Sequence, residues 1–412
     1  MASGGEQQRR FETRAVHAGE ARPGAESPAV RGTDGSYPIS TPIYASTTFS
    51  HADVQTTDRV LGGEEPGYSY ARWGNPSVAA LEAALTALES PEGGARALAF
   101  ASGMAAMHAA LTAAEAGEGA RVLAAEQLYG STATLLLQIF GPAGTETVFF
   151  DAYDLGEAEK KVSTLRPRAV VVETISNPLL RVADIPRLAE ITRSYGAALI
   201  VDNTFGTPYL QRPLELGADM VVHSATKYLS GHGDVTAGVV AAGPPYDTAL
   251  EQIRKTVGST LGPFEAWLLH RGLKTLPLRV ARQCENARRI ASWLAEHPKV
   301  SRVHHPSLAD HPDREAAERL LADTGGLVAF ELAAGSREAA FRFLNALRLC
   351  VRAPSLGDIY TLAIHPATSS HRELPPSRRE QLGVKEGLIR LSAGIEHPED
   401  IIADLEHALE RL

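Results

Sequence analysis

The sequence of 412 residues predicts an α/β protein with a large, mainly parallel seven-stranded sheet and a smaller C-terminal α+β domain. Seven short apolar runs lie between residues 96 and 242, and helical stretches separate most of them. The runs do not alternate with polar residues, which favours strands buried on both faces of a parallel sheet. Residues 1–60 are rich in Gly, Ser, Thr and Pro, and they predict an N-terminal arm.

The elements follow one another from Asn75-Pro76-Ser77, a turn with capping residues that opens a helix over 78–88. The apolar runs predict strands at 96–101, 121–125, 147–150, 169–173, 198–202, 220–223 and 237–242. Helices are expected between them at 104–115, 129–139, 154–164 and 185–195.

A long helical tract over 263–297, broken near Pro277, links the large domain to the C-terminal one. Beyond the tract we expect strands at 326–332, 349–353 and 388–395, with helices at 312–322, 336–347 and 399–411. The chain therefore divides into an arm (1–60), a large domain (61–262) and a C-terminal domain (263–412). Within the arm, residues 22–36 have the composition of a flexible insertion.

Composition excludes several classes of protein. The chain carries 40 Lys and Arg against 49 Asp and Glu, a net charge of −9, which argues against nucleic-acid binding and suits an anionic membrane surface poorly. No apolar stretch approaches the ~20 residues of a membrane helix, and no signal peptide is expected. Cys284 and Cys350 are the only cysteines, so we expect no disulfide framework and a cytoplasmic protein.

The segment SATKYLSGHGD, residues 224–234, follows the expected strand 220–223 directly. Lys227 at this strand end, flanked by hydroxyls and then glycines, suits a Schiff base with pyridoxal phosphate. Removal from water and nearby positive charge both favour the neutral amine that this chemistry needs. Ser224 and Thr226 can donate hydrogen bonds to phosphate oxygens. Taken alone, a surface lysine in a polar turn explains the segment equally well.

Asp202 ends the preceding expected strand, and a carboxylate at that position faces the crevice of a parallel sheet. Pyridoxal phosphate needs such an acid, because it keeps the pyridine nitrogen protonated. An N-cap or turn aspartate is the alternative, and it is less favoured once Lys227 is considered.

Four further residues occupy suitable positions, each with a structural alternative. Gly103 opens a helix after a strand, where backbone N–H groups bind phosphate well, although such turns are common. Tyr129 could stack on a pyridine ring or be a core tyrosine. Asn177, before a proline, could donate to a phenolate oxygen or form a turn. Arg390 lies within an apolar strand and needs a partner, either a substrate carboxylate or a structural salt bridge.

Together these residues resemble the pyridoxal-phosphate enzymes of cysteine and methionine metabolism, from about Thr41 to Leu412. This family includes cystathionine γ-synthase, cystathionine γ-lyase, methionine γ-lyase and the O-acylhomoserine sulfhydrylases. The matching stretches are Tyr70-Ala71-Arg72, Asn75-Pro76, Ala101 to Met104, Val201 to Thr204, His223 to Gly233, Ser355 to Gly357 and Ile389 to Ser392. The resemblance implies the aminotransferase fold type I, with pyridoxal phosphate bound by the large domain, and a tetramer built from two catalytic dimers.

The resemblance also implies a role for each matching residue. Lys227 would hold the cofactor and shuttle protons, Asp202 would pair with the pyridine nitrogen, and Tyr129 would stack on the ring and assist proton transfer. The phosphate would be held by Gly103, Met104, Ser224 and Thr226 of one subunit and by Tyr70 and Arg72 of its neighbour. The substrate carboxylate or the cofactor's hydroxyl side would be bound by Arg390, Asn177 and Ser355. No metal is implied.

Within the family, the run from Thr207 to Asp219 is most similar to the methionine γ-lyases. The implied activity is a C–S γ-lyase acting on methionine- or cystathionine-like amino acids and releasing a thiol, a 2-oxo acid and ammonia. Three positions depart from the usual residues, namely Ser131, Lys255 after Arg254, and Ala71. The alternatives are γ-replacement on an O-acylated homoserine, as in an O-acylhomoserine sulfhydrylase or cystathionine γ-synthase, a catalytically silent relative and an aminotransferase.

Overall fold

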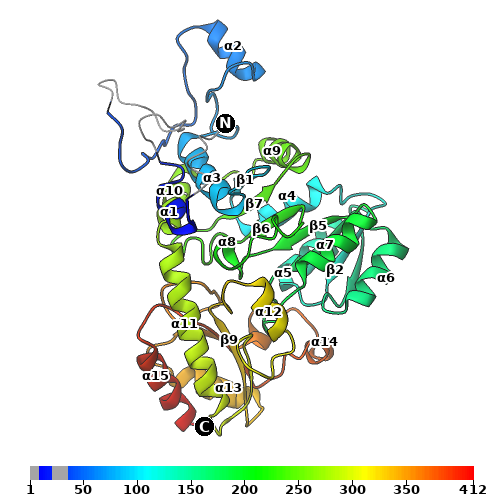
Figure 1. Cartoon of the computed structure of the whole chain (residues 1–412), viewed down its shortest axis with the longest axis vertical. Helices are drawn as coiled ribbons and strands as arrows, with labels where there is room; N and C mark the ends of the chain where they lie inside the picture. Colours follow the sequence, from blue (N-terminus) through cyan, green and yellow to red (C-terminus); the bar gives the residue numbers. More distant parts are fainter. Residues whose placement is uncertain (1–8, 21–35) are drawn as a thin grey trace.

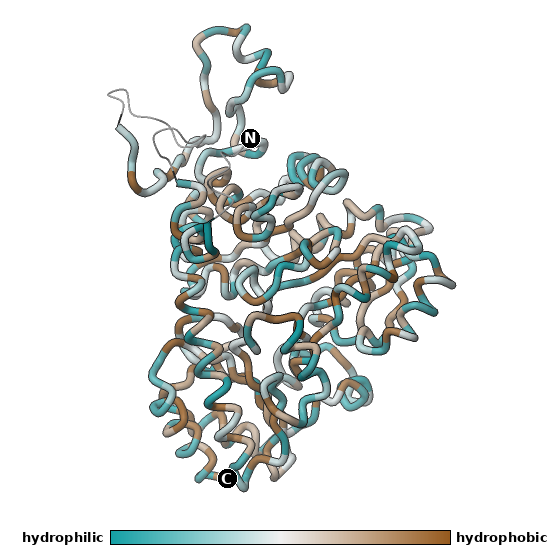
Figure 2. Tube along the Cα trace, in the orientation of Figure 1, coloured by the Kyte–Doolittle hydropathy of each residue, from teal (hydrophilic) through white to brown (hydrophobic). Residues whose placement is uncertain are grey.

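The computed structural model describes residues 9–20 and 36–412, so the expected insertion at 22–36 lies, except for Ser36, outside the described residues. Figure 1 shows the large sheet and its helices in one half of the molecule and the C-terminal elements in the other, with α11 (Leu276–Ala295) running between them. Hydrophobic segments gather inside both halves, while the outer helices are largely hydrophilic (Figure 2).

The large sheet has seven strands in the order β1-β7-β6-β5-β4-β2-β3. β7 is antiparallel to both of its neighbours, and all other pairs are parallel, which confirms the predicted fold class. Every residue of β4 is buried, in agreement with its unbroken apolar run. The strands are β1 (Arg96–Phe100), β2 (Arg121–Ala125), β3 (Glu146–Phe150), β4 (Ala169–Glu173), β5 (Ala198–Asp202), β6 (Met220–His223) and β7 (Gly238–Ala242).

Helices fill most gaps between these strands. Asn75, Asp154 and Asp184 cap three of them with side-chain oxygens that accept backbone N–H bonds. The helix expected over 129–139 is α-helical only to Leu135 and continues as a π-helical turn. The helices are α3 (Pro76–Glu89), α4 (Gly103–Ala113), α5 (Gly130–Leu135), the π-turn η1 (Leu136–Phe140), α6 (Leu155–Leu165), α7 (Ile185–Ser194), α8 (Thr207–Leu210) and α9 (Tyr246–Val257).

The helical tract 263–297 consists of α10 (Pro263–Leu273) and α11, and Pro277 lies in the first turn of α11, where proline costs no hydrogen bond. The second sheet has the order β10-β11-β12-β9-β8. Its strands are β8 (Val300–His304), β9 (Leu327–Leu332), β10 (Val351–Arg352), β11 (Leu362–Ile364) and β12 (Leu388–Ser392). The remaining elements are α12 (Arg314–Leu320), α13 (Arg337–Ala346), the 3₁₀ turn η2 (Pro366–Thr368), α14 (Pro376–Gln381) and α15 (Pro398–Glu410).

The arm contains two short helices that the sequence did not predict, α1 (Phe11–His17) and α2 (Val54–Gly62). The turn after α1 is anchored to α10, because His270 bonds to the Ala18 carbonyl. In contrast, α2 has no buried residue and stands away from the rest of the chain (Figure 1). The domain limits at 60 and 262 stay a proposal, and apolar residues of α10 also pack into the core of the large sheet.

None of the helices in the described parts of the chain combines the length and the apolar character needed to span a bilayer. Nor do the described residues gather three or more His, Cys, Asp or Glu side chains in a way that could hold a metal ion.

A buried arginine on α11 fixes the loop that follows Lys227. Arg279 donates to the carbonyl oxygens of Tyr228 and Gly272, both at 2.8 Å, and it is 4% exposed. Gly231, with φ +72°, packs on the guanidinium so closely that a Cβ there would lie 1.9 Å from Arg279 Nη1. The loop backbone after the predicted catalytic lysine is therefore held by a side chain from the long helix.

We expect Arg279→Leu to lower the free energy of unfolding by roughly 2–4 kcal/mol, because it leaves buried carbonyl groups without a donor. Urea unfolding followed by fluorescence measures this change. The control on the same helix is Arg289→Leu, which breaks an exposed pair with Glu399 and should cost no more than about 1 kcal/mol. Equal unfolding midpoints for the two variants would contradict the proposed anchoring.

Candidate active site

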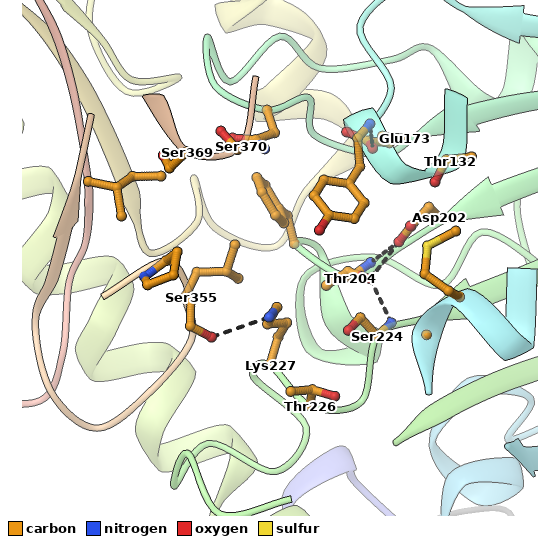
Figure 3. Close-up of a pocket in the computed structure, with 18 of the residues that line it drawn as sticks. Thr132, Glu173, Asp202, Thr204, Ser224, Thr226, Lys227, Ser355, Ser369 and Ser370 are labelled. Atoms are coloured by element: carbon orange, nitrogen blue, oxygen red, sulfur yellow. Dashed lines mark hydrogen bonds between the residues drawn. The ribbon is translucent and has the colours of Figure 1, made fainter. Parts of the chain in front are cut away.

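A cavity of about 550 Å³ lies between the large sheet and the C-terminal elements. Figure 3 shows side chains from both parts of the chain converging on it. The cavity brings together ten of the twelve predicted site residues, namely Gly103, Met104, Tyr129, Asn177, Asp202, Ser224, Thr226, Lys227, Ser355 and Arg390.

The convergence follows from strand direction. β1, β2, β4, β5 and β6 all run the same way, so the segments after them emerge at one edge of the sheet. Gly103, Tyr129, Asn177 and Lys227 lie on the segments that follow four of these strands, and Asp202 is the last residue of the fifth.

Lys227 points into this cavity and is half-buried. Its Nζ donates a hydrogen bond to Ser355 Oγ at 3.2 Å (Figure 3). Burial, followed by the positive charge of Arg390, lowers the pKa of Lys227 below its ordinary value. A lowered pKa increases the fraction of neutral amine, which is the form that attacks a carbonyl carbon.

Asp202 is tied through Thr204 to the segment that carries Lys227. Asp202 Oδ1 accepts hydrogen bonds from the Thr204 N–H at 3.0 Å and from Thr204 Oγ1 at 2.5 Å. Thr204 Oγ1 in turn accepts the N–H of Ser224 at 2.8 Å. Burial raises the pKa of Asp202. A cationic group beside this carboxylate would offset that effect, which fits a protonated pyridine nitrogen.

The start of α4 forms a concave surface next to Ser224. A Cβ at Gly103 would lie only 2.8 Å from Ser224 Cβ, so a glycine is required for this approach. Thr226 Oγ1 is bonded to the backbone of Ala237, accepting its N–H at 3.0 Å. The first N–H groups of this 11-residue helix have no partner within the helix, and beside a serine hydroxyl they suit a phosphate group.

Arg390 is buried in β12, and its partners are neutral. Its Nη1 donates to Asn177 Oδ1 at 2.8 Å and its Nη2 to the Ser355 carbonyl at 3.0 Å. Its Nε is buried without a hydrogen-bond partner among the described residues. Burial lowers the pKa of Arg390 to about 10. The structural alternative was a salt bridge of Arg390, and none is present among the described residues. The guanidinium can therefore bind the carboxylate of a ligand.

Glu173, at the end of β4, is a cavity residue that the sequence reasoning missed. Its Oε1 accepts the backbone N–H of Tyr129 at 2.6 Å, which fixes the start of α5. Burial, followed by the charge of Asp202, raises the pKa of Glu173 well above its usual range. A carboxylate ending a buried strand was the same signal that identified Asp202. The other missed polar residues are Ser102, Thr132, Thr204, Thr236, Thr368, Ser369, Ser370 and Arg372.

Tyr70 and Arg72 do not line this cavity. Arg72 donates to the Lys255 carbonyl, and its guanidinium carbon lies 5.5 Å from the centroid of the Tyr70 ring. Arg72 belongs instead to a separate cavity of about 180 Å³ with Glu82 and Arg254. Within one chain, therefore, the structure does not bring these two predicted phosphate-binding residues to Lys227.

The fold and the cavity define the class of protein, a pyridoxal-phosphate-binding enzyme of the aminotransferase fold type. A lysine amine, a buried aspartate, the start of a helix and a guanidinium without a carboxylate partner among the described residues lie in one cavity. The chain belongs to the Cys/Met metabolism PLP-dependent enzyme family, whose model matches residues 13–410.

The relatives in this family cover almost the whole chain. The chain is 43% identical to L-methionine gamma-lyase of Pseudomonas putida, over 90% of this chain and 92% of that protein. It is 41% identical to cystathionine gamma-lyase of Bacillus subtilis, over 91% and 95%. The crystal structure of metB from Corynebacterium glutamicum superposes with a TM-score of 0.88 at 37% identity, covering 98% of this chain and 99% of that one. The predicted family, fold class, cofactor and enzyme class are thereby confirmed.

Glu173 offers a test of this geometry that needs no substrate. We expect Glu173→Gln to retain pyridoxal phosphate, because an amide oxygen can still accept the Tyr129 N–H. Glu173→Leu leaves that N–H unpaired and should weaken cofactor binding about tenfold. Cofactor titration, followed by visible absorbance, measures both variants. A Leu variant with the affinity and spectrum of the unchanged protein would contradict the positioning role of Glu173.

Proposed function

We propose that the chain is a C–S γ-lyase that cleaves methionine- or cystathionine-like amino acids to a thiol, a 2-oxo acid and ammonia. The lyase relatives support this function over γ-replacement. The observation that carries the proposal is the placement of Lys227 and Arg390 in one cavity. Arg390 keeps a buried Nε free for a carboxylate, and Lys227 holds an amine of lowered pKa beside it.

In this proposal the bound cofactor supplies an electron sink for charge that develops at the substrate's Cα. Arg390 binds the α-carboxylate through charge-assisted hydrogen bonds and so orients the substrate in the cavity. Lys227 takes the Cα proton and returns protons during turnover, which its lowered pKa favours. Asp202 holds the positive charge of the ring nitrogen, and Glu173 keeps Tyr129 in place against the ring.

We expect the purified protein to form 2-oxobutyrate, ammonia and a thiol from methionine or cystathionine. Lys227→Ala should lower turnover by about 10⁴-fold or more, because both the covalent attachment and the proton carrier are lost. Assays for 2-oxobutyrate and free thiol measure the reaction. Formation of a new thioether from an O-acylhomoserine and a thiol, without 2-oxobutyrate from either substrate, would replace the lyase proposal with γ-replacement.

We further propose that the protein is a cytoplasmic dimer of dimers in which Tyr70 and Arg72 of one chain reach the cavity of its neighbour. The arm supports this arrangement, since Ile39 is 93% exposed and Val54 79% exposed in the single chain. Removing such apolar side chains from water under a second chain would lower the free energy of the assembly. The cytoplasmic location is supported by Cys284 and Cys350, which are both free and buried.

Mixing two inactive variants tests the shared site. We expect Arg72→Ala and Lys227→Ala, combined under subunit exchange, to regain about one quarter of the wild-type activity, because half of the dimers are mixed and each holds one intact site. The control mixes Lys227→Ala with Asp202→Asn, whose changes fall in the same cavity, and it should stay inactive. Absence of recovery in the first mixture, with exchange demonstrated, would contradict the cross-subunit role of Arg72.

A further inference from the structure

The cavity contains a third cationic side chain, Arg372, besides Lys227 and Arg390. Arg372 is exposed, and its side chain makes no hydrogen bond or ion pair within the described residues. The nearby arginines differ from it, since Arg378 pairs with Glu126 and Arg379 with Glu386. The guanidinium of Arg372 is thus available to a ligand in the cavity.

The backbone that carries Arg372 is fixed by a series of hydrogen bonds. The Arg372 N–H bonds to the Ser369 carbonyl at 3.2 Å, and the His371 N–H bonds to the Pro366 carbonyl at 3.0 Å. Ser369 Oγ also donates to the His365 carbonyl at 2.7 Å. A fixed backbone limits where the guanidinium can reach and reduces the conformational entropy lost on binding.

The position of this segment separates Arg372 from the phosphate end of the site. Figure 3 shows Ser369 and Ser370 across the cavity from Ser224 and Thr226. The Ser370 carbonyl lies close to Gly130, because a Cβ on that glycine would be 3.2 Å from it. Arg372 therefore belongs to the side of the cavity where α5 begins, away from the start of α4.

The charges of cofactor and substrate leave Arg372 without an assigned partner. The phosphate is matched by the start of α4 with Ser224, and the α-carboxylate by Arg390. Asp202 is matched by the ring nitrogen. Glu373, the next residue along the chain, does not line the cavity. The other carboxyl group of the cavity, Glu173, accepts the Tyr129 N–H and has a raised pKa, which favours its neutral form. One positive charge therefore remains unmatched on the side of the cavity where α5 begins.

We propose that Arg372 binds a second carboxylate at the far end of the substrate, so that the site prefers γ-thioether amino acids with an anionic end. Cystathionine has such an end, and methionine has none. A guanidinium fork matches a carboxylate in charge and in bidentate geometry, so it selects for this group. The inference rests on the proposed lyase function and narrows its substrate class.

The test compares two substrates that differ only in charge, S-(2-carboxyethyl)homocysteine and its neutral amide, with the holoenzyme. We expect Arg372→Gln to lower kcat/KM for the carboxylate about tenfold, mainly through KM, and to change the value for the amide less than about twofold. Arg372→Lys should restore much of the loss, because it keeps the positive charge. Arg378→Gln, which removes a nearby arginine outside the cavity, is the matched control and should leave both values unchanged.

Equal effects of Arg372→Gln on the two substrates, or a wild-type preference for the amide, would overturn the proposal. A different result would contradict the proposed lyase function, namely that the wild-type protein forms no 2-oxobutyrate from any thioether. In that case calorimetric binding of the same two compounds to wild type and Arg372→Gln still decides the role of Arg372. A loss of affinity confined to the carboxylate supports it, and an equal loss for both compounds refutes it.

Discussion

The shared direction of β1, β2, β4, β5 and β6 is the constraint on which the candidate active site depends. Parallel strands place their carboxyl ends at one edge, and the crossover helices keep both faces of the sheet dry. Residues from five segments that are far apart in the sequence therefore meet in one cavity. The antiparallel β7 lies between β1 and β6 and pairs with both. It thereby sets the spacing at which Gly103, after β1, lies beside Ser224, after β6.

This alignment also places two carboxyl groups side by side, and the charge of one acts on the other. Glu173 and Asp202 are register partners at the ends of β4 and β5. Burial raises the pKa of both groups, and each accepts hydrogen bonds that favour its charged form, Asp202 from Thr204 and Glu173 from the Tyr129 N–H. The charge of Asp202 raises the pKa of Glu173 further. Asp202 can therefore be charged beside a cation while Glu173 stays neutral and bonds to the backbone of Tyr129. The two adjacent carboxyl groups then do not repel each other.

Sequence reasoning was strongest where the evidence was local. Lys227 and Asp202 each follow a buried apolar run, and parallel-strand geometry then fixes their place. It failed where placement depends on distant partners. The three-residue β11 is too short to show a pattern, and Arg372 is an ordinary exposed arginine until the fold brings it to the cavity. Arg72 is a different case, because its proposed place depends on a second chain.

The two parts of the chain contribute different things to the site. Within one chain, the groups that we propose for the cofactor lie on the segments at the carboxyl ends of the large sheet's strands, where register leaves little freedom. The groups that we propose for the substrate all lie beyond residue 350, namely Arg390, Ser355 and Arg372. Arg390 belongs to a strand and bonds across to Asn177, so the α-carboxylate position is tied to the sheet edge. Arg372 lies on a turn between β11 and α14, where a change of residue alters the cavity without disturbing either sheet. The choice among γ-substituents can therefore vary while the chemistry at Cα is kept.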